Sequence, residues 1–210
     1  MKTLTAVTAL SVMFCAGCYT VSRPEPPRTN HYYVNPRANF TTVGRVALLE
    51  LENLSARQEL SEILSQTLAD GLNKHHLFSV QTVMHSDPIW QTLNLDNIKA
   101  QALDDLAALS RTLNVGGVLF GTIQRYQSFP HLQVSINLKL VDTRSGQLLW
   151  ALEDVWDSGD KAVENRMRKF FEEQMRSGYE PMDWQIMLLS PRAFERFVVY
   201  EITETLPKFP

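Results

Sequence analysis

The chain has 210 residues, with 20 Lys and Arg against 23 Asp and Glu, and a formal net charge of -3. Hydrophobic residues make up 44% and charged residues 20%, which is the balance of a globular chain that can build a core. No basic excess favours nucleic-acid binding, and no acidic block indicates a disordered tail. The two cysteines are Cys15 and Cys18, so the rest of the sequence excludes a disulfide scaffold, a thiolate zinc site and a cysteine nucleophile.

Residues 1–17 have the pattern of a secretory signal peptide. Lys2 supplies a positive charge, the stretch 4–14 is uncharged and mostly apolar, and small residues precede Cys18. The apolar stretch is shorter than the roughly 20 residues that a permanent transmembrane helix needs. We therefore expect this segment to direct export.

The segment Cys15-Ala16-Gly17-Cys18 resembles the lipobox of bacterial lipoproteins, although Leu is commonest where Cys15 stands. The resemblance implies cleavage before Cys18 and lipid on its sulfur, which leaves a mature chain of 193 residues (210 minus 17). The alternative is an ordinary signal peptide that ends near a cysteine. Tyr19 rather than Asp follows the cysteine, which by the enterobacterial sorting rule implies the outer membrane. We expect a lipid-anchored protein that faces the periplasm and carries no cofactor besides this lipid.

Residues 18–42 are predicted to form the lipidated cysteine and a Pro-rich tether. Four prolines among polar residues favour extended chain over a packed core. His31, Tyr32 and Tyr33 are interpreted as spacer residues, with docking on the domain or on a partner as the alternative.

Residues 43–210 are predicted to form one α/β (α+β) domain: a mixed sheet of about five strands with a carboxy-terminal antiparallel meander, covered by about four helices. Short apolar runs and alternating segments separated by turn residues indicate the strands. The expected strands span 43–51, 77–83, 117–127, 132–140 and 147–156.

Apolar residues at helical spacing indicate the helices. The first is expected to begin with a capping box at Ser55 and to end near His75 or His76. Others are expected from Asp96 to Leu113, over 160–176, and from Ser190 to Leu206 with Pro191 at the first helical position. The stretches 84–95 and 177–189 are predicted loops.

Two segments resemble a family of envelope proteins that includes the curli-secretion lipoprotein CsgG, the Pel-export lipoprotein PelC, the peptidoglycan-synthase activator LpoB and the amino-terminal domain of TolB. Residues 119–123 (LFGTI) are similar to one strand of that family. Residues 140–147 (LVDTRSGQ) with Trp150 are similar to its hairpin. The resemblance covers roughly 43–206. It implies an anchored, non-enzymatic lipoprotein that is often assembled into a ring or bound to a larger machine.

No catalytic or metal motif of established spacing is present. His75 and His76 fall at a predicted helix end, where a cation suits the helix dipole, and adjacent residues point in different directions on a helix. Asp154, Asp157 and Asp160 invite a calcium interpretation, for which helix capping by Ser158 or Asp160 is the simpler account. The pair 116–117 (GG) enters a strand from a helix end, the wrong order for a phosphate loop. We predict no catalytic residue and no metal ligand.

Trp90, Tyr179 and Trp184 lie in predicted loops and are candidate interface residues, since aromatic residues are enriched at protein interfaces. We therefore expect a periplasmic lipoprotein that acts as a non-enzymatic binding or assembly component of a machine for export, secretion or cell-wall synthesis. Its expected partners are the membrane, envelope proteins and further copies of itself. The alternatives are an oligomeric ring or collar of an export channel, and an envelope enzyme with an unrecognised site.

Overall fold

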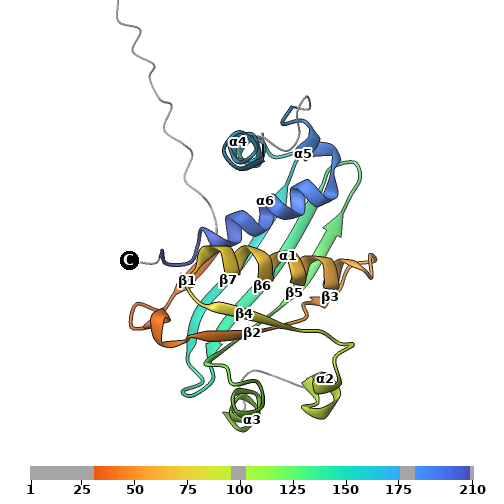
Figure 1. Cartoon of the computed structure of the whole chain (residues 1–210). Helices are drawn as coiled ribbons and strands as arrows, with labels where there is room; N and C mark the ends of the chain where they lie inside the picture. The colour runs from red at the N-terminus through yellow and green to blue at the C-terminus, as the bar shows by residue number, and fades with distance from the viewer. Residues whose placement is uncertain (1–30, 96–102, 176–182, 209–210) are drawn as a thin grey trace, which may run out of the picture.

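The computed structural model describes residues 31–95, 103–175 and 183–208 (Figure 1). These residues form a seven-stranded mixed sheet in the order β1-β7-β6-β5-β2-β4, with β3 beside β5. The strands are β1 (His31–Val34), β2 (Arg45–Leu49), β3 (Glu52–Asn53), β4 (Ser79–Val83), β5 (Gly117–Gln127), β6 (Gln133–Asp142) and β7 (Leu148–Asp157).

The sheet has a parallel half and an antiparallel half. Strand β2 pairs in parallel with both β4 and β5, while β5, β6, β7 and β1 form an antiparallel meander. The predicted mixed sheet with its carboxy-terminal meander is therefore confirmed, and β1 and β3 are additional strands. The prediction missed them because β1 is short and largely exposed and β3 has only two residues.

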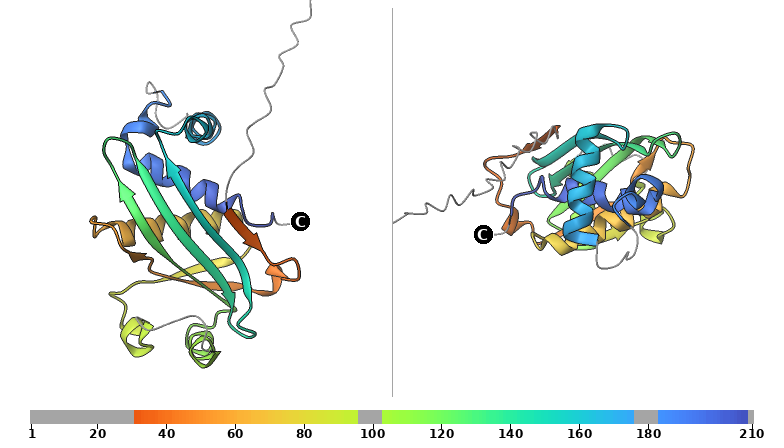
Figure 2. Two further views of the ribbon diagram at one scale, coloured as in Figure 1. Left: turned by 180° about the vertical axis from the view of Figure 1, so that it is seen from behind. Right: turned by 90° about the horizontal axis from the view of Figure 1, so that it is seen from above.

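Helices pack on both faces of the sheet (Figures 1 and 2). Helices α1, α4 and α6 contribute to one hydrophobic core, and α2 and α3 contribute to a second core on the opposite face of β2 and β5. The helices are α1 (Leu60–His75), α2 (Pro88–Thr92), α3 (Leu103–Leu113), α4 (Lys161–Phe170), α5 (Ile186–Leu189) and α6 (Pro191–Thr203), with a 3-10 turn at Phe40–Thr42 and a π-helical turn at Phe171–Met175.

Residues 31–42 belong to the folded domain, which corrects their assignment to the tether. Strand β1 pairs antiparallel with β7, and Phe40 is buried in the larger core. The tyrosines and the core phenylalanine stand in a sequence whose Pro and Asn content favours extended chain. An extended segment of this kind can pair as a short edge strand without an alternating apolar pattern. Residues 18–30 of the predicted tether and the predicted signal peptide lie outside the described residues.

Three local predictions are wrong. Ser55 does not cap α1, because its backbone N–H and its hydroxyl both donate to the Asn53 side chain, and the helix begins only at Leu60. The stretch 84–95 is not wholly a loop, since α2 forms there with Pro88 at its first turn. The described part of the predicted loop 177–189 likewise contains a helix, the short α5.

Other helix ends agree with their predictions. Helix α1 ends at His75, and Asp160 and Ser190 cap α4 and α6 by accepting backbone N–H bonds. Residues 96–102, which include the predicted cap Asp96, lie outside the described residues. Within the described part of the chain, none of the helices is both long and apolar enough to span a membrane.

Candidate functional site

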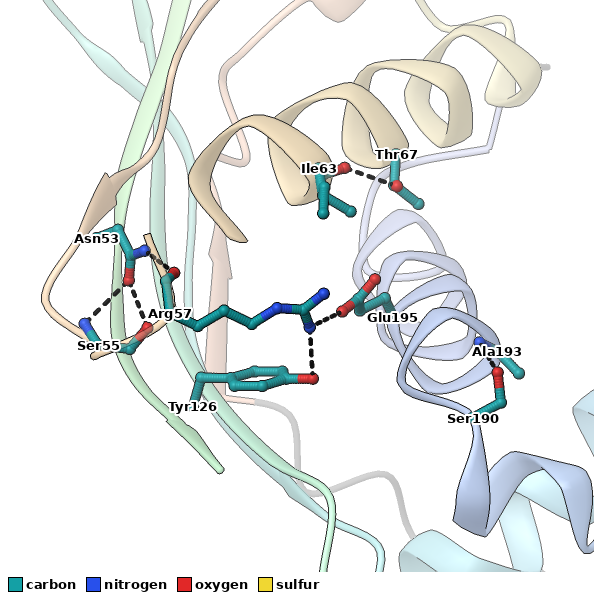
Figure 3. A network of polar contacts seen from close by, with 9 residues as sticks. All are labelled: Asn53, Ser55, Arg57, Ile63, Thr67, Tyr126, Ser190, Ala193 and Glu195. Atoms are coloured by element: carbon teal, nitrogen blue, oxygen red, sulfur yellow. Dashed lines mark hydrogen bonds and ion pairs between the residues drawn. The ribbon is translucent and has the colours of Figure 1, made fainter. Parts of the chain in front are cut away.

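A groove of about 1410 Å³ runs between α1 and α6. The two helices touch near Gly71, where an added Cβ would lie 2.4 Å from Val199 Cγ1. Toward the beginning of the two helices the Arg57 side chain reaches between them (Figure 3). The lining continues past this contact to Lys74 and Glu204, and polar side chains around Arg57 lie between the helices near their beginnings.

Three residues form a polar network that we call the floor; Arg57 and Glu195 line the groove, and Tyr126 bonds Arg57. Arg57 Nη1 donates to the Tyr126 hydroxyl at 2.9 Å and to Glu195 Oε1 at 3.2 Å. The Arg57 guanidinium also lies 5.4 Å from the centre of the Tyr126 ring. Arg57 precedes α1, Tyr126 lies near the end of β5 and Glu195 lies in α6, so the network connects α6 and the start of α1 to the sheet (Figure 3).

Asn53 fixes the loop that carries Arg57. Its side-chain amide donates to the Arg57 carbonyl at 2.7 Å, and its oxygen accepts from Ser55 N at 2.9 Å. An Asn side chain often replaces backbone partners in this way within turns. The loop therefore presents Arg57 at a defined place instead of leaving it on a free connection.

A β-bulge aims Tyr126 at the helices. Strict alternation from Ile123 would turn Arg125 toward α6 and Tyr126 away from it. The register with β6 shifts between these positions, so that Tyr126 is paired with Val134, whose side chain is buried in the larger core. A bulge adds one residue and so exchanges the faces of all that follow. Tyr126 could not be predicted from the strand's alternation for this reason.

Burial dominates the electrostatics of the floor. Desolvation raises the pKa of Glu195, against the lowering effect of the charge and hydrogen bond of Arg57. Desolvation, followed by the charge of Glu195, also raises the pKa of the Tyr126 hydroxyl. Glu195 is almost completely buried, whereas about a third of the Arg57 side chain is exposed at the groove surface.

A second ion pair lies apart from the groove floor. Arg166 Nε of α4 donates to Glu201 Oε2 of α6 at 2.8 Å, and both side chains are buried. Burial raises the pKa of the neighbouring Asp154, partly offset by a backbone hydrogen bond and by the charges of His31 and Arg166. This buried ion pair connects α4 to α6, and neither of its side chains is exposed to solvent.

The predicted site residues fall in three places. Cys15, Ala16, Gly17, Cys18 and Tyr179 lie outside the described residues. Trp90 is not an exposed loop residue: it belongs to α2, is 4% exposed, and stacks on His85 with ring centres 3.8 Å apart. Trp184 is half-buried beneath the Arg168 guanidinium, which lies 4.4 Å from its ring centre. Neither Trp90 nor Trp184 lines the groove.

The polar clusters noted in the sequence have structural partners. Asp160 caps α4, as the simpler interpretation of the aspartates expected, and the Ser158 hydroxyl accepts from Leu132 N. At Gly116 an added Cβ would lie 2.2 Å from the Val43 carbonyl oxygen, so this glycine permits close backbone packing. In the part of the chain that the structure describes, no group of three His, Cys, Asp or Glu side chains could hold a metal ion.

No protein-family model and no curated protein sequence matches the chain. Among solved structures, the fold is similar to that of the PelC dodecamer from Paraburkholderia phytofirmans, with 13% identity and a TM-score of 0.45 over 65% of this chain and 88% of that chain. It is also similar to lipoprotein GNA1162 from Neisseria meningitidis, with 17% identity and a TM-score of 0.43 over 64% of this chain and 98% of that one. A third similar structure is the LpoB C-terminal domain from Salmonella enterica, with 13% identity and a TM-score of 0.39 over 54% of this chain and 82% of that chain.

PelC and LpoB are two of the proteins that the sequence motifs resemble, and their structures are found again by fold. Similarity at this level describes the arrangement of helices and strands only.

Proposed function

We propose that the protein is a lipid-anchored component of the bacterial cell envelope that binds another envelope protein and has no catalytic activity of its own. The observation that carries the proposal is the order of the parts. A lipobox-like Cys18 is followed within a short stretch by a folded domain that includes His31. Such an order suits a module held close to a membrane.

The polar chemistry of the domain supports binding rather than catalysis. The buried carboxylates Glu195 and Glu201 are paired with Arg57 and Arg166, which leaves no nucleophile beside a free base at these positions. The groove between α1 and α6 is a surface on which a partner could be held. Two or three acyl chains, each methylene contributing about 0.8 kcal/mol on burial, would make the anchor effectively permanent.

Replacement of the proposed lipidation site tests the anchor. Cys18→Ala should move the protein from the membrane fraction to the soluble fraction, because the thiol that carries the lipid is gone. Cys15→Leu is the matched control and should stay with membranes, since Leu is the commoner residue at that place. Mass spectrometry of the wild type should find acyl chains on Cys18. An unlipidated wild type, with Cys18→Ala still in the membrane fraction, would show that the anchor is wrong.

Crosslinking in native membranes, followed by purification of the full chain, tests the binding role. We expect a defined envelope protein to be recovered with the wild type. Recovery of the chain without any crosslinked protein would contradict the proposal.

A further inference from the structure

The two walls of the groove carry opposite charges. On the α1 side the exposed acidic residues are Glu59, Glu62 and Asp70, and on the α6 side the exposed basic residues are Arg192 and Arg196. Residues three and four apart lie on one side of a helix, so each set forms a stripe along its wall. Near the beginnings of the two helices the groove therefore presents an acidic edge and a basic edge that face each other, whereas Lys74 and Glu204 line its other end.

These charges are not paired with one another. In the described ranges of the chain, Glu59, Glu62, Arg192 and Arg196 form no ion pair within 4.0 Å. The contact between the two sides is made on the floor, by Arg57 and Glu195. Both stripes are therefore available to a molecule that lies above this floor.

The size of the groove favours a polypeptide over a small molecule. Its volume of about 1410 Å³ exceeds the range of about 300–1,000 Å³ that is usual for small-molecule pockets. From Glu59 to Asp70 the α1 wall is about 16 Å long at 1.5 Å per residue. An extended peptide of about five residues covers that length at about 3.3 Å per residue.

We propose that this groove binds an extended segment of a partner protein in which acidic and basic side chains alternate. In an extended chain successive side chains point to opposite edges, so alternation places all the acidic groups on one edge and all the basic groups on the other. The acidic edge would face Arg192 and Arg196, and the basic edge would face Glu59 and Glu62. This inference rests on the proposed binding function and specifies the partner's chemistry.

Arg57 offers a contact for the backbone of such a segment. A guanidinium has five N–H donors, and Nη1 serves Tyr126 and Glu195. The side chain is about a third exposed, so its outer N–H groups can donate to a carbonyl oxygen above the floor. Its position is already fixed by the two floor contacts, which lowers the entropy lost on binding.

Fluorescence anisotropy with a labelled peptide of about ten alternating Glu and Lys residues tests the inference, with the full chain kept in a non-ionic detergent. Arg192→Glu with Arg196→Glu, or Glu59→Lys with Glu62→Lys, should each weaken binding by about tenfold, because attractive contacts become repulsive. All four substitutions together exchange the walls and should restore binding, since the peptide can turn its edges round. Asp105→Lys with Arg111→Glu on α3 is the matched control and should bind as the wild type does.

Three results would overturn the inference. The first is equal binding of a peptide with the same composition arranged as a Glu block and a Lys block. The second is equal binding by the wall variants and the α3 control. The third is no peptide binding together with a change of oligomeric state in the wall variants, which would identify a second copy as the occupant. Membrane attachment and crosslinking do not depend on these peptides, so their outcomes judge the proposed function separately.

Discussion

At the scale of single residues, the polar side chains of the sequence motifs hold turns and helix ends in place. Asp142 Oδ1 accepts from Arg144 N and Ser145 N, each at 2.8 Å, and so closes the hairpin between β6 and β7. Trp150 Nε1 donates to the Thr205 hydroxyl at 3.1 Å, which ties β7 to the residues that follow α6. The segment 140–150 that resembles the envelope lipoproteins is thus a structural unit in this chain, and its resemblance concerns the fold.

Glu195 should make the stability of the protein depend on pH. Burial raises its pKa, so the folded state keeps the proton at pH values where the unfolded state has released it. Its contribution to the free energy of unfolding is full below the ordinary pKa and is lost as pH rises toward the folded pKa. In Glu195→Gln the side chain cannot titrate, so the variant does not lose stability at this position as pH rises.

The comparison is made by urea unfolding at about pH 4 and about pH 7. The stability of the wild type minus that of Glu195→Gln should be lower at the higher pH. Asp154, whose pKa is also raised, is present in both proteins, so its effect cancels. A difference that increases with pH would contradict the prediction.

At the scale of elements, Gly121 shows why a motif glycine is needed in β5. An added Cβ would lie 2.1 Å from the Asn137 carbonyl oxygen and 2.7 Å from Leu138 Cδ2 of β6. A backbone oxygen inside a sheet cannot move away without breaking the ladder. Gly121→Ala should therefore destabilise the protein by about 3 kcal/mol, the upper end of the usual cost of overpacking.

Thr122→Ala is the matched control, because its side chain is on the opposite face of the same strand and bonds the Glu52 carboxylate near the surface. Its cost should be below about 1 kcal/mol. Chemical denaturation of the two variants measures both values. Equal costs would mean that β6 does not restrict position 121.

Periodicity in the sequence was enough to predict the elements that build the cores. The apolar stripe of α6 and the alternation of β6 both depend on long, regular patterns, and both were predicted correctly. The start of α1 could not be predicted, because the sequence pattern at Ser55 does not reveal that its N–H and hydroxyl both donate to the Asn53 side chain. The groove floor was missed for a similar reason: it joins Arg57, Tyr126 and Glu195 across distant segments and requires a bulge that leaves no mark in composition.

At the scale of the whole molecule, the first described strand lies at the edge of the sheet, directly after the proposed anchor segment. Strand β1 pairs with β7, and the described chain ends at Lys208 beyond α6, in the same region of the molecule (Figures 1 and 2). The groove lies between α1 and α6, and the Arg57 network reaches between these helices near their beginnings (Figure 3). A pull on the anchor would therefore act on the β1 edge, and the groove would receive its partner on the helical layer.

The incorporation of residues 31–42 into the domain predicts unequal costs for two aromatic substitutions. Phe40 is 6% exposed and packs in the larger core, whereas Tyr32 of β1 is 52% exposed. Phe40→Ala should destabilise the protein by about 3 kcal/mol, because it leaves a cavity in that core. Tyr32→Ala should cost about 0.5 kcal/mol, as is usual at the surface. Thermal and urea unfolding of the two variants compare these values directly. If both substitutions left stability unchanged, residues 31–42 would behave as a spacer, and the folded domain would begin near Val43.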